Sequence, residues 1–233
     1  MAIFAISDLH LSFNGNKPMD VFGSRWEKYE ERMQENWNKV VTNDDLVVIP
    51  GDISWAMYLQ ETEADFAYIH SLNGQKLLLR GNHDYWWTTL NKMEEFVREK
   101  GFSTIHFLKN SGFLWEETAI CGTRGWSIAH GGSSEEDKKI YERERQRMIL
   151  SLEDARRLPA KEILAAFHFP PVENFGISNG FLDILHNYEV KKCVFGHLHG
   201  EAHRNAPQGI QDGIRLRLVS CDYLDFMPIC IKK

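Results

Sequence analysis

The stretch KLLLRGNHD at residues 76–84 shows how this chain is organised. A short apolar run, Lys76 to Leu79, predicts a buried strand, and the polar turn Gly81-Asn82-His83-Asp84 follows it. The same arrangement occurs four more times: Ala2 to Ile6 before Asp8-Leu9-His10, Leu46 to Ile49 before Gly51-Asp52, Glu162 to Phe167 before His168, and Lys192 to Phe195 before Gly196-His197-Leu198-His199. Because strand ends meet at one edge of a sheet, the five clusters should converge in one crevice.

The residue types in these clusters suit divalent transition-metal ions. Carboxylates, one amide oxygen and neutral imidazoles favour Mn, Fe or Zn, whereas an all-oxygen set would favour Mg or Ca, and thiolates would favour structural Zn. None of the four cysteines lies in a cluster. Two ions about 3.5 to 4 Å apart need a ligand that spans them, and a carboxylate has two oxygens for this purpose. The sequence therefore predicts a two-metal site with Asp52 as the bridge.

In order and spelling, the clusters resemble those of the calcineurin-like metallophosphoesterase superfamily. Its pattern runs Asp-x-His, Gly-Asp, Gly-Asn-His-Asp or Glu, a lone His, and Gly-His-x-His, and every element is present between residues 8 and 199. The resemblance implies one ion bound by Asp8, His10, Asp52 and His199, and a second bound by Asp52, Asn82, His168 and His197. It also implies that His83 is a catalytic histidine that binds no metal.

The resemblance further implies a fold and a reaction. The fold is a four-layer α/β/β/α sandwich, in which two mixed sheets are flanked by helices and the metal site lies at the carboxyl ends of strands. The reaction is hydrolysis of a phosphodiester or phosphomonoester by a metal-bridging hydroxide, because two cations can lower the pKa of a shared water from about 15.7 towards neutrality. Two ions, with Mn favoured over Fe or Zn, are the expected cofactors.

Two residues of the Asn-His-Asp turn are predicted to take part in catalysis. His83 should assist departure of the leaving group, a contribution that is typically worth about 10²- to 10⁴-fold. Asp84 is its neighbour in the chain and is expected to orient the imidazole or stabilise its charge.

Residues for binding the substrate are less sharply marked. Arg124 follows a strand, and its guanidinium is predicted to bind phosphate; the alternative is an ion pair with Glu116 or Glu117. At least one of the aromatic residues 85–87 is predicted to line the substrate pocket, and the other two to pack in the core. For Trp55 both positions remain open. This aromatic surround favours a small phosphorylated substrate such as a nucleotide, with a diester narrowly preferred to a monoester.

Composition narrows the class of protein. A chain of 233 residues with 43% hydrophobic content is expected to form one domain over residues 1–233. The net charge of −6 provides no general basic field, so nucleic acid is an unexpected partner. We expect neither export nor a membrane span, because the apolar start stops at Asp8 and no run approaches 18 apolar residues. The widely spaced cysteines predict buried free thiols and a cytoplasmic location.

Two other functions remain open on the sequence alone. The first is a nuclease acting on DNA or RNA, which a salt-dependent binding assay would reveal. The second is a metal-binding scaffold with little catalysis, which full metal occupancy without turnover would reveal. The intact ligand pattern and His83 favour the hydrolase, and the sequence leaves the oligomeric state open.

The rest of the chain is predicted from periodicity and turn residues. The expected helices are a stripe of Trp26, Tyr29, Met33, Trp37 and Val40 capped by Ser24, then Glu61 to Leu72, Thr88 to Lys100, the charged segment Ser133 to Leu158, and Ser178 to Asn187. Strands Gly112 to Trp115 and Thr118 to Gly122 should begin a second, partly antiparallel sheet, and Arg215 to Ser220 and Met227 to Ile231 should complete it. The histidines without a motif, His70, His106, His130, His186 and His203, are expected to be surface or hydrogen-bonded residues.

Overall fold

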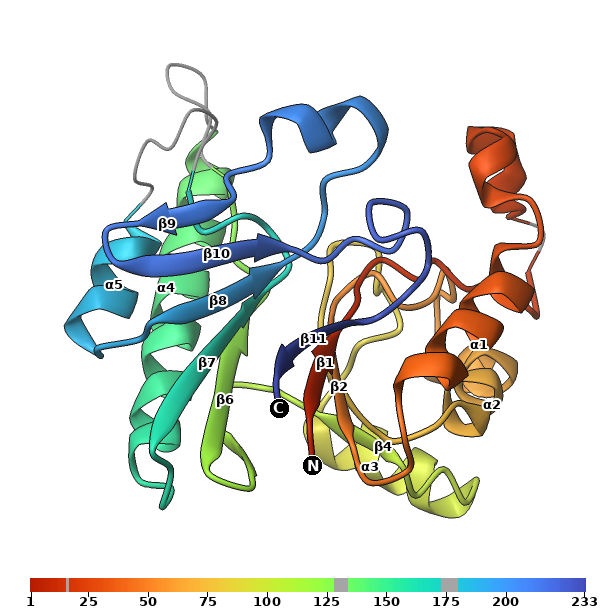
Figure 1. The fold of residues 1–233 in the computed structure, drawn as a ribbon, viewed down its shortest axis with the longest axis horizontal. Coiled ribbons are helices and arrows are strands. Elements are labelled where there is room, and N and C mark those ends of the chain that lie inside the picture. The colour runs from red at the N-terminus through yellow and green to blue at the C-terminus, as the bar shows by residue number, and fades with distance from the viewer. Residues whose placement is uncertain (16, 128–133, 173–179) are drawn as a thin grey trace.

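Two β-sheets lie face to face between two layers of helices in the computed structural model (Figure 1), which describes residues 1–15, 17–127, 134–172 and 180–233. The first sheet has five strands in the order β11-β1-β2-β3-β4, and they are parallel except for β11. Its strands are β1 (Ile3–Ala5), β2 (Leu46–Pro50), β3 (Gln75–Leu79), β4 (Ile105–Phe107) and β11 (Ile229–Lys232).

The second sheet has six strands in the order β5-β6-β7-β8-β10-β9. Its four central strands are parallel, and the outer strands β5 and β9 are antiparallel to their neighbours. The strands are β5 (Phe113–Trp115), β6 (Thr118–Thr123), β7 (Glu162–Phe167), β8 (Lys192–Phe195), β9 (Gly209–Gln211) and β10 (Ile214–Leu218). Both sheets are therefore mixed, as the sequence predicts.

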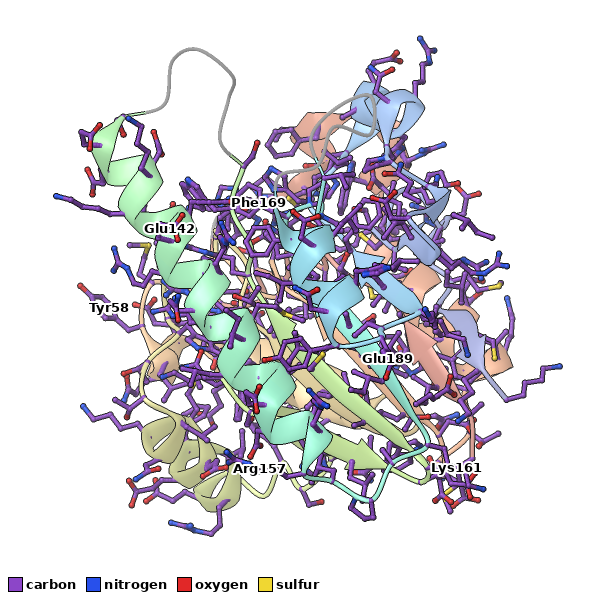
Figure 2. All side chains as sticks on the ribbon, turned by 90° about the vertical axis from the view of Figure 1, so that its left-hand side faces the viewer. Tyr58, Glu142, Arg157, Lys161, Phe169 and Glu189 are labelled. Atoms are coloured by element: carbon purple, nitrogen blue, oxygen red, sulfur yellow. The ribbon has the colours of Figure 1, made fainter. Side chains whose placement is uncertain are left out.

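Helices cover the outer face of each sheet (Figure 1). On the first sheet these are α1 (Tyr29–Val40), α2 (Glu63–Ser71) and α3 (Leu90–Glu99); on the second they are α4 (Glu135–Arg156) and α5 (Phe181–Asn187). Figure 2 looks onto α4 and α5, with Glu142 on the outward side of α4. The inward side of α4 buries Met148, Leu152 and Ala155 against the second sheet. The charged segment thus forms a helix that covers a core, as predicted.

Strand residues alternate between two apolar layers because successive side chains point to opposite faces. Phe4 and Ile6 pack among the helices of the first sheet, whereas Ile3 and Ala5 pack between the two sheets. Both faces of each sheet are covered, which explains why the strands are continuously apolar in the sequence. The predicted four-layer α/β/β/α architecture is confirmed.

Two details of the prediction are wrong. The segment Met227 to Ile231 contributes β11, which joins the first sheet antiparallel to β1 and not the second sheet. Ser24 does not cap a long helix: Ser24–Trp26 is a separate 3₁₀ turn, and α1 begins only at Tyr29, after Lys28 in the left-handed conformation. The left-handed residue breaks the helical path, so the stripe of apolar residues is distributed over two elements.

Several smaller predictions can also be compared with the structure. The antiparallel pair β5 and β6 is confirmed. The predicted helix starts Ser133 and Ser178 lie outside the described residues, as does His130. All four cysteines are free, and Cys121, Cys193 and Cys221 are buried. Across the described ranges, no helix combines the length and apolar composition that a membrane span requires.

Candidate metal centre

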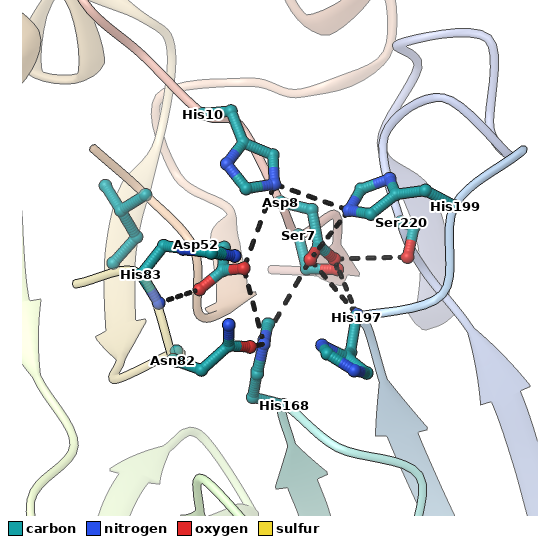
Figure 3. A network of polar contacts seen from close by, with 12 residues as sticks. Ser7, Asp8, His10, Asp52, Asn82, His83, His168, His197, His199 and Ser220 are labelled. Carbon is teal, nitrogen blue, oxygen red and sulfur yellow. Dashed lines mark hydrogen bonds and ion pairs between the residues drawn. The ribbon is translucent and has the colours of Figure 1, made fainter. Parts of the chain in front are cut away.

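The predicted metal ligands meet at the carboxyl ends of five strands (Figure 3). Asp8 and His10 follow β1, Asp52 follows β2, Asn82 follows β3, His168 follows β7, and His197 and His199 follow β8. One ligand atom from each of Asp8, His10 and His199 lies within 4.8 Å of the others, and the same holds for Asp52, His168 and His197. These two clusters correspond to the two ligand sets that the motifs imply.

The Asp52 carboxylate lies between the clusters. Its Oδ2 atom is 3.8 Å from Nε2 of His10 in the first cluster and 3.4 Å from Nε2 of His168 in the second. Its Oδ1 atom accepts the backbone N–H of His83 at 2.8 Å. The structure thus leaves one oxygen of Asp52, and not both, facing the two ligand sets.

Hydrogen-bond acceptors face one another in the second cluster. Nδ1 of His168 lies 3.0 Å from the Pro50 carbonyl oxygen and must donate to it, because a carbonyl only accepts. The lone pair of the neutral ring is then on Nε2, which lies 2.6 Å from Oδ1 of Asn82 and 3.4 Å from Oδ2 of Asp52. Three electron-rich atoms therefore converge, an arrangement that either a proton on Asp52 or a bound cation would stabilise.

The first cluster has the same character. Nδ1 of His199 lies 2.9 Å from the Asp222 carboxylate, to which it donates, so Nε2 is the nitrogen that faces the site and, in the neutral ring, carries the lone pair. That Nε2 atom is 3.3 Å from Oδ1 of Asp8 and 3.3 Å from Nε2 of His10. The donor set of imidazole nitrogens and carboxylate oxygens therefore fits a mid-series divalent ion here as well.

Electrostatics within the site show the same excess of anionic groups. Burial, reinforced by the Asp8 carboxylate, raises the pKa of Asp52 to about 8. Burial alone would lower the pKa of His199, but Asp8 and Asp222 outweigh it and raise that pKa to about 10. Burial lowers the pKa of His10 to about 3, which keeps this ring neutral and able to coordinate. A proton or another cation is needed to offset the repulsion between the Asp8 and Asp52 carboxylates.

The backbone at the site adopts conformations that side chains normally avoid. Asp8, His10, Asp52 and His197 all have positive φ angles, between 47° and 72°. Such residues cost about 1 to 3 kcal/mol each and are concentrated at functional sites. The glycines of the motifs allow close approach: a Cβ on Gly81 would clash with the Asp52 carboxylate, so a side chain at this position would displace the ligand.

A second layer of residues holds the ligands in place. Oδ2 of Asp8 accepts hydrogen bonds from the Ser7 hydroxyl and, at 3.1 Å, from the Ser220 hydroxyl, while Oδ1 points towards His199. Asp222 orients His199 and also accepts the N–H of Gly200 at 3.1 Å. Sequence reasoning missed Ser220 and Asp222, because they follow a terminal strand and belong to none of the motifs.

His203 lies beside this second layer. Its Nε2 atom is 3.3 Å from Oδ2 of Asp222, so the ring touches a residue that orients a ligand. It belongs to the 3₁₀ segment Gly200–Asn205, labelled η5, which explains why its spacing of four from His199 does not make a helical metal pair.

Asp84 performs a different task from the predicted one. Its carboxylate accepts the backbone N–H groups of Asp52, Ile53, Ser54 and Gly81 at 2.6 to 3.3 Å, and Nε1 of Trp86 at 3.1 Å. The oxygens are used in fixing the loop that carries Asp52, and not in orienting the His83 imidazole. The prediction failed because adjacent residues in a tight turn direct their side chains apart.

The His83 ring lies in an aromatic pocket at the edge of the clusters. Its centroid is 4.6 Å from the Trp55 ring and 5.8 Å from the His10 ring. Its Nδ1 atom is buried and has no hydrogen-bond partner among the described residues. Burial, together with the nearby His168, lowers the pKa of His83. The ring is thus neutral near pH 7 and presents an unused nitrogen.

The pocket beside His83 is apolar and has a volume of about 480 Å³. Met19, Phe22, Trp26 and Trp55 form its walls, and His10, His83 and His199 lie at its inner end. Trp55 stacks on His10 with 4.9 Å between centroids. Of the two readings of Trp55, the pocket wall is therefore the one that the structure supports.

Arg124, Trp86 and Trp87 do not line this pocket, and the Tyr85 ring lies edge-on to His83 with 6.3 Å between centroids. The guanidinium of Arg124 pairs with Glu144 on α4 at 3.2 Å, and not with Glu116 or Glu117. Trp86 is buried in the core, whereas Trp87 and Arg124 line a separate cleft.

Comparison with known proteins agrees with this geometry. Residues 1–201 match the model of the calcineurin-like phosphoesterase family. The chain belongs to that family. This phosphoesterase is accordingly a hydrolase, and the family match covers all the metal-site motifs. No curated protein matches its sequence.

Solved structures share the fold of this phosphoesterase at low sequence identity. A Thermus thermophilus protein has a TM-score of 0.59 and 10% identity, with 99% of this chain and 97% of that chain covered. The phosphopantetheinyl hydrolase of Mycobacterium tuberculosis has a TM-score of 0.56 and 17% identity, with 94% and 88% covered. A protein of unknown function from Aquifex aeolicus has a TM-score of 0.52 and 16% identity, with 98% and 95% covered. These likenesses support the α/β/β/α architecture.

Proposed function

We propose that this chain hydrolyses a phosphoester of a small molecule with two divalent ions, Mn²⁺ being the favoured metal. The observation that carries the proposal is the convergence of carboxylate, amide and imidazole acceptor atoms around Oδ2 of Asp52. Asp8, His10 and His199 would hold one ion, Asn82, His168 and His197 would hold the other, and Asp52 would touch both. When bound, the two ions would supply charge that polarises phosphoryl oxygens and activates a water molecule.

The chain's own residues would position the ester and help the leaving group. His83 stands at the inner end of the apolar pocket with an unpartnered nitrogen, where it can donate a hydrogen bond or a proton to the departing oxygen. An anionic substrate beside the ring would raise its pKa, opposing the effect of burial. Asp84 would be a positioning residue, because its carboxylate fixes the backbone of Asp52 and of the Gly81 turn.

The apolar pocket favours an ester whose leaving group is flat or apolar. Trp26 and Trp55 line the pocket beside His83, where Trp55 stacks on His10 and the ammonium group of Lys17 lies 4.6 Å from the Trp55 ring centre. A nucleoside or a similar group has the size and flatness for such a pocket, and a diester presents it on the leaving side. We therefore favour a phosphodiester over a phosphomonoester as substrate, and a cytoplasmic small molecule over a nucleic acid.

The test is Mn²⁺-supplemented turnover of bis-p-nitrophenyl phosphate beside p-nitrophenyl phosphate. We expect diester cleavage that chelation abolishes and that His83→Ala slows about 10²- to 10⁴-fold without loss of bound metal. His186→Ala, which removes an exposed histidine of α5, is the matched control and should leave the rate unchanged. Full metal occupancy without turnover of either ester would argue against the proposal and favour a metal-binding scaffold.

A further inference from the structure

A second cleft, with a volume of about 340 Å³, is lined by residues that neighbour the proposed ligands Asn82 and His168 along the chain or through a hydrogen bond. Arg80 in its wall is two residues before Asn82. Arg124 in its opposite wall accepts the backbone N–H of Phe169, the neighbour of His168, at 2.8 Å through its carbonyl oxygen. Consecutive Cα atoms are about 3.8 Å apart, so the Cα atom of Arg80, which lines the cleft, lies within about 8 Å of the Cα atom of Asn82.

The cleft is strongly cationic. Four basic side chains line it: Arg80 after β3, Lys109 after β4, Arg124 after β6 and Arg147 on α4. Glu144 is the one acidic residue among the lining residues. Four positive charges around one negative charge leave a local excess of three, in a chain whose net charge is −6. This pocket therefore differs in sign from the molecule that contains it.

The single carboxylate in the cleft is fully used. Glu144 is buried and accepts hydrogen bonds from the Thr123 hydroxyl, from Arg124 at 3.2 Å and from Arg147 at 2.6 Å. Lys109 donates to the backbone carbonyl of Thr88. Glu144 thus holds two guanidinium groups in place but cannot neutralise all four cations.

Unused donors remain in the cleft. The Nε atoms of Arg80 and Arg124 are buried and have no hydrogen-bond partner among the described residues. The guanidinium of Arg124 is also 4.7 Å from the Trp126 ring centre, which restricts its orientation. Buried N–H groups of a guanidinium are costly to leave unpaired, so an acceptor from outside the chain would be bound with a gain.

The four cations also repel one another. Burial, followed by the charges of Arg147 and Arg80, lowers the pKa of Lys109. Burial likewise lowers the pKa of Arg124, with Arg80 and Arg147 adding to the effect and Glu144 opposing it. The charged groups that line the cleft therefore act on one another electrostatically.

We propose that this cleft binds a second phosphate group of the substrate, distinct from the phosphoester that is cleaved. Three guanidinium groups and one ammonium group match a tetrahedral dianion, because they offer several donors and a surplus of charge. The substrate class is then a small molecule with two phosphate groups, one at the metal centre and one in the cationic cleft. This inference rests on the proposed function, and it widens the role predicted for Arg124 to a set of four residues.

The test compares alkylphosphonates with alkylene diphosphonates in which two to eight carbons separate the phosphonate groups. Affinity for the Mn²⁺-loaded chain is measured by titration calorimetry. A C–P bond is not hydrolysed, so the result does not depend on turnover and can be told apart from a failure of the proposed phosphoesterase activity. We expect at least one diphosphonate to bind tenfold or more tightly than the matching monophosphonate.

Variants of the cleft test whether its basic residues cause the higher affinity for the diphosphonate. Arg147→Met and Lys109→Met should each reduce it to about the twofold factor that two equivalent ends provide. Arg143→Met, on the exposed side of the same helix, should retain the full gain. Lys109→Met serves as the second variant in case the loss of Arg147 leaves Glu144 unbalanced and unfolds the chain. The inference is overturned if no spacer length gives a gain, or if the gain persists in both cleft variants.

Discussion

The two edges of the paired sheets arrange their polar groups in opposite ways. At the amino edge, donors face acceptors: Glu162 accepts from Lys192 at 3.0 Å and from Lys232 at 2.6 Å, which links the second sheet to β11 of the first. At the carboxyl edge, acceptors face acceptors around Asp52 and His168. At the amino edge the charged groups of the chain pair with one another, whereas the facing acceptor atoms at the carboxyl edge suit a bound cation.

The proposed ligands at the carboxyl edge also have strained backbone conformations. The carboxyl edge holds Asp8, His10, Asp52 and His197 in the left-handed conformation, which lowers stability to secure geometry. At the amino edge the buried Lys76 at the start of β3 donates to the carbonyls of Leu72 and His70 beside the end of α2. One edge serves function and the other serves stability, and substitutions should therefore affect different measurements.

The largest effect is expected for Asp52→Ala. Without the oxygen that lies between the clusters, we expect turnover of bis-p-nitrophenyl phosphate to fall about 10³-fold, which corresponds to about 4 kcal/mol in the activation barrier. Bound Mn²⁺, measured by elemental analysis, should fall as well. An Asp52→Ala enzyme that retains near-normal activity would contradict the two-metal assignment.

Asp84→Asn tests whether the second layer of the carboxyl edge is structural. The amide NH₂ of asparagine would face backbone N–H groups that now donate to the carboxylate, and two donors cannot form a hydrogen bond. We therefore expect the free energy of unfolding to fall by about 2 to 3 kcal/mol. Urea denaturation measures the change. Asp183→Asn, at an exposed position of α5, is the control, and a change no larger than that of the control would refute this role.

Lys76→Met tests the amino edge through pH. Burial lowers the pKa of Lys76 to about 8, so the unfolded chain, with an ordinary lysine pKa near 10.5, binds more protons between these values. The stability of the wild type should therefore rise relative to Lys76→Met between pH 8 and pH 10.5, by up to about 2 kcal/mol. Thermal denaturation at each pH gives the difference, and Lys39→Met provides an exposed-lysine control. A flat difference would show that Lys76 stays protonated.

Glu162→Gln should have the smallest effect. Burial would raise the pKa of Glu162, but Lys232 and Lys192 lower it, so its contribution is present above its unfolded pKa and is lost as the pH falls through the folded value. We expect a loss of about 1 kcal/mol or less at pH 7 that disappears in acid. Glu94→Gln, at an exposed position of α3, is the control for denaturation measurements. A loss that persists in acid would indicate packing instead of charge.

The sequence alone predicted those parts of the molecule in which a local pattern of residues determines where they lie in the fold. The strands that lead to Asp8, Asp52 and His168 are apolar because both faces of each sheet are covered. A polar residue follows each strand, so predicting the strand also places that residue at the carboxyl edge of the sheet. The convergence of the ligands could likewise be predicted, since parallel strands bring their carboxyl ends together, whereas their division into two sets came from the resemblance to the family.

Other features depend on contacts that no local pattern encodes. Alternation identifies β11 as a strand but does not specify which sheet it joins. Asp222 lies in a loop with no motif, although its carboxylate orients His199. The cationic cleft is assembled from residues up to 67 positions apart in the chain, from Arg80 to Arg147, so its charge is visible only after folding.

The bridge between Ser7 and Ser220 has a consequence for the order of events during biosynthesis. Asp8 emerges from the ribosome early, yet the Ser220 hydroxyl and the His197 amide that hold its carboxylate are synthesised some 190 to 210 residues later. A nascent chain can form the apolar strands but lacks the partners that shape the first ligand cluster. The hydrogen bonds that hold Asp8, one of the proposed ligands, are therefore complete only after Ser220 has been synthesised.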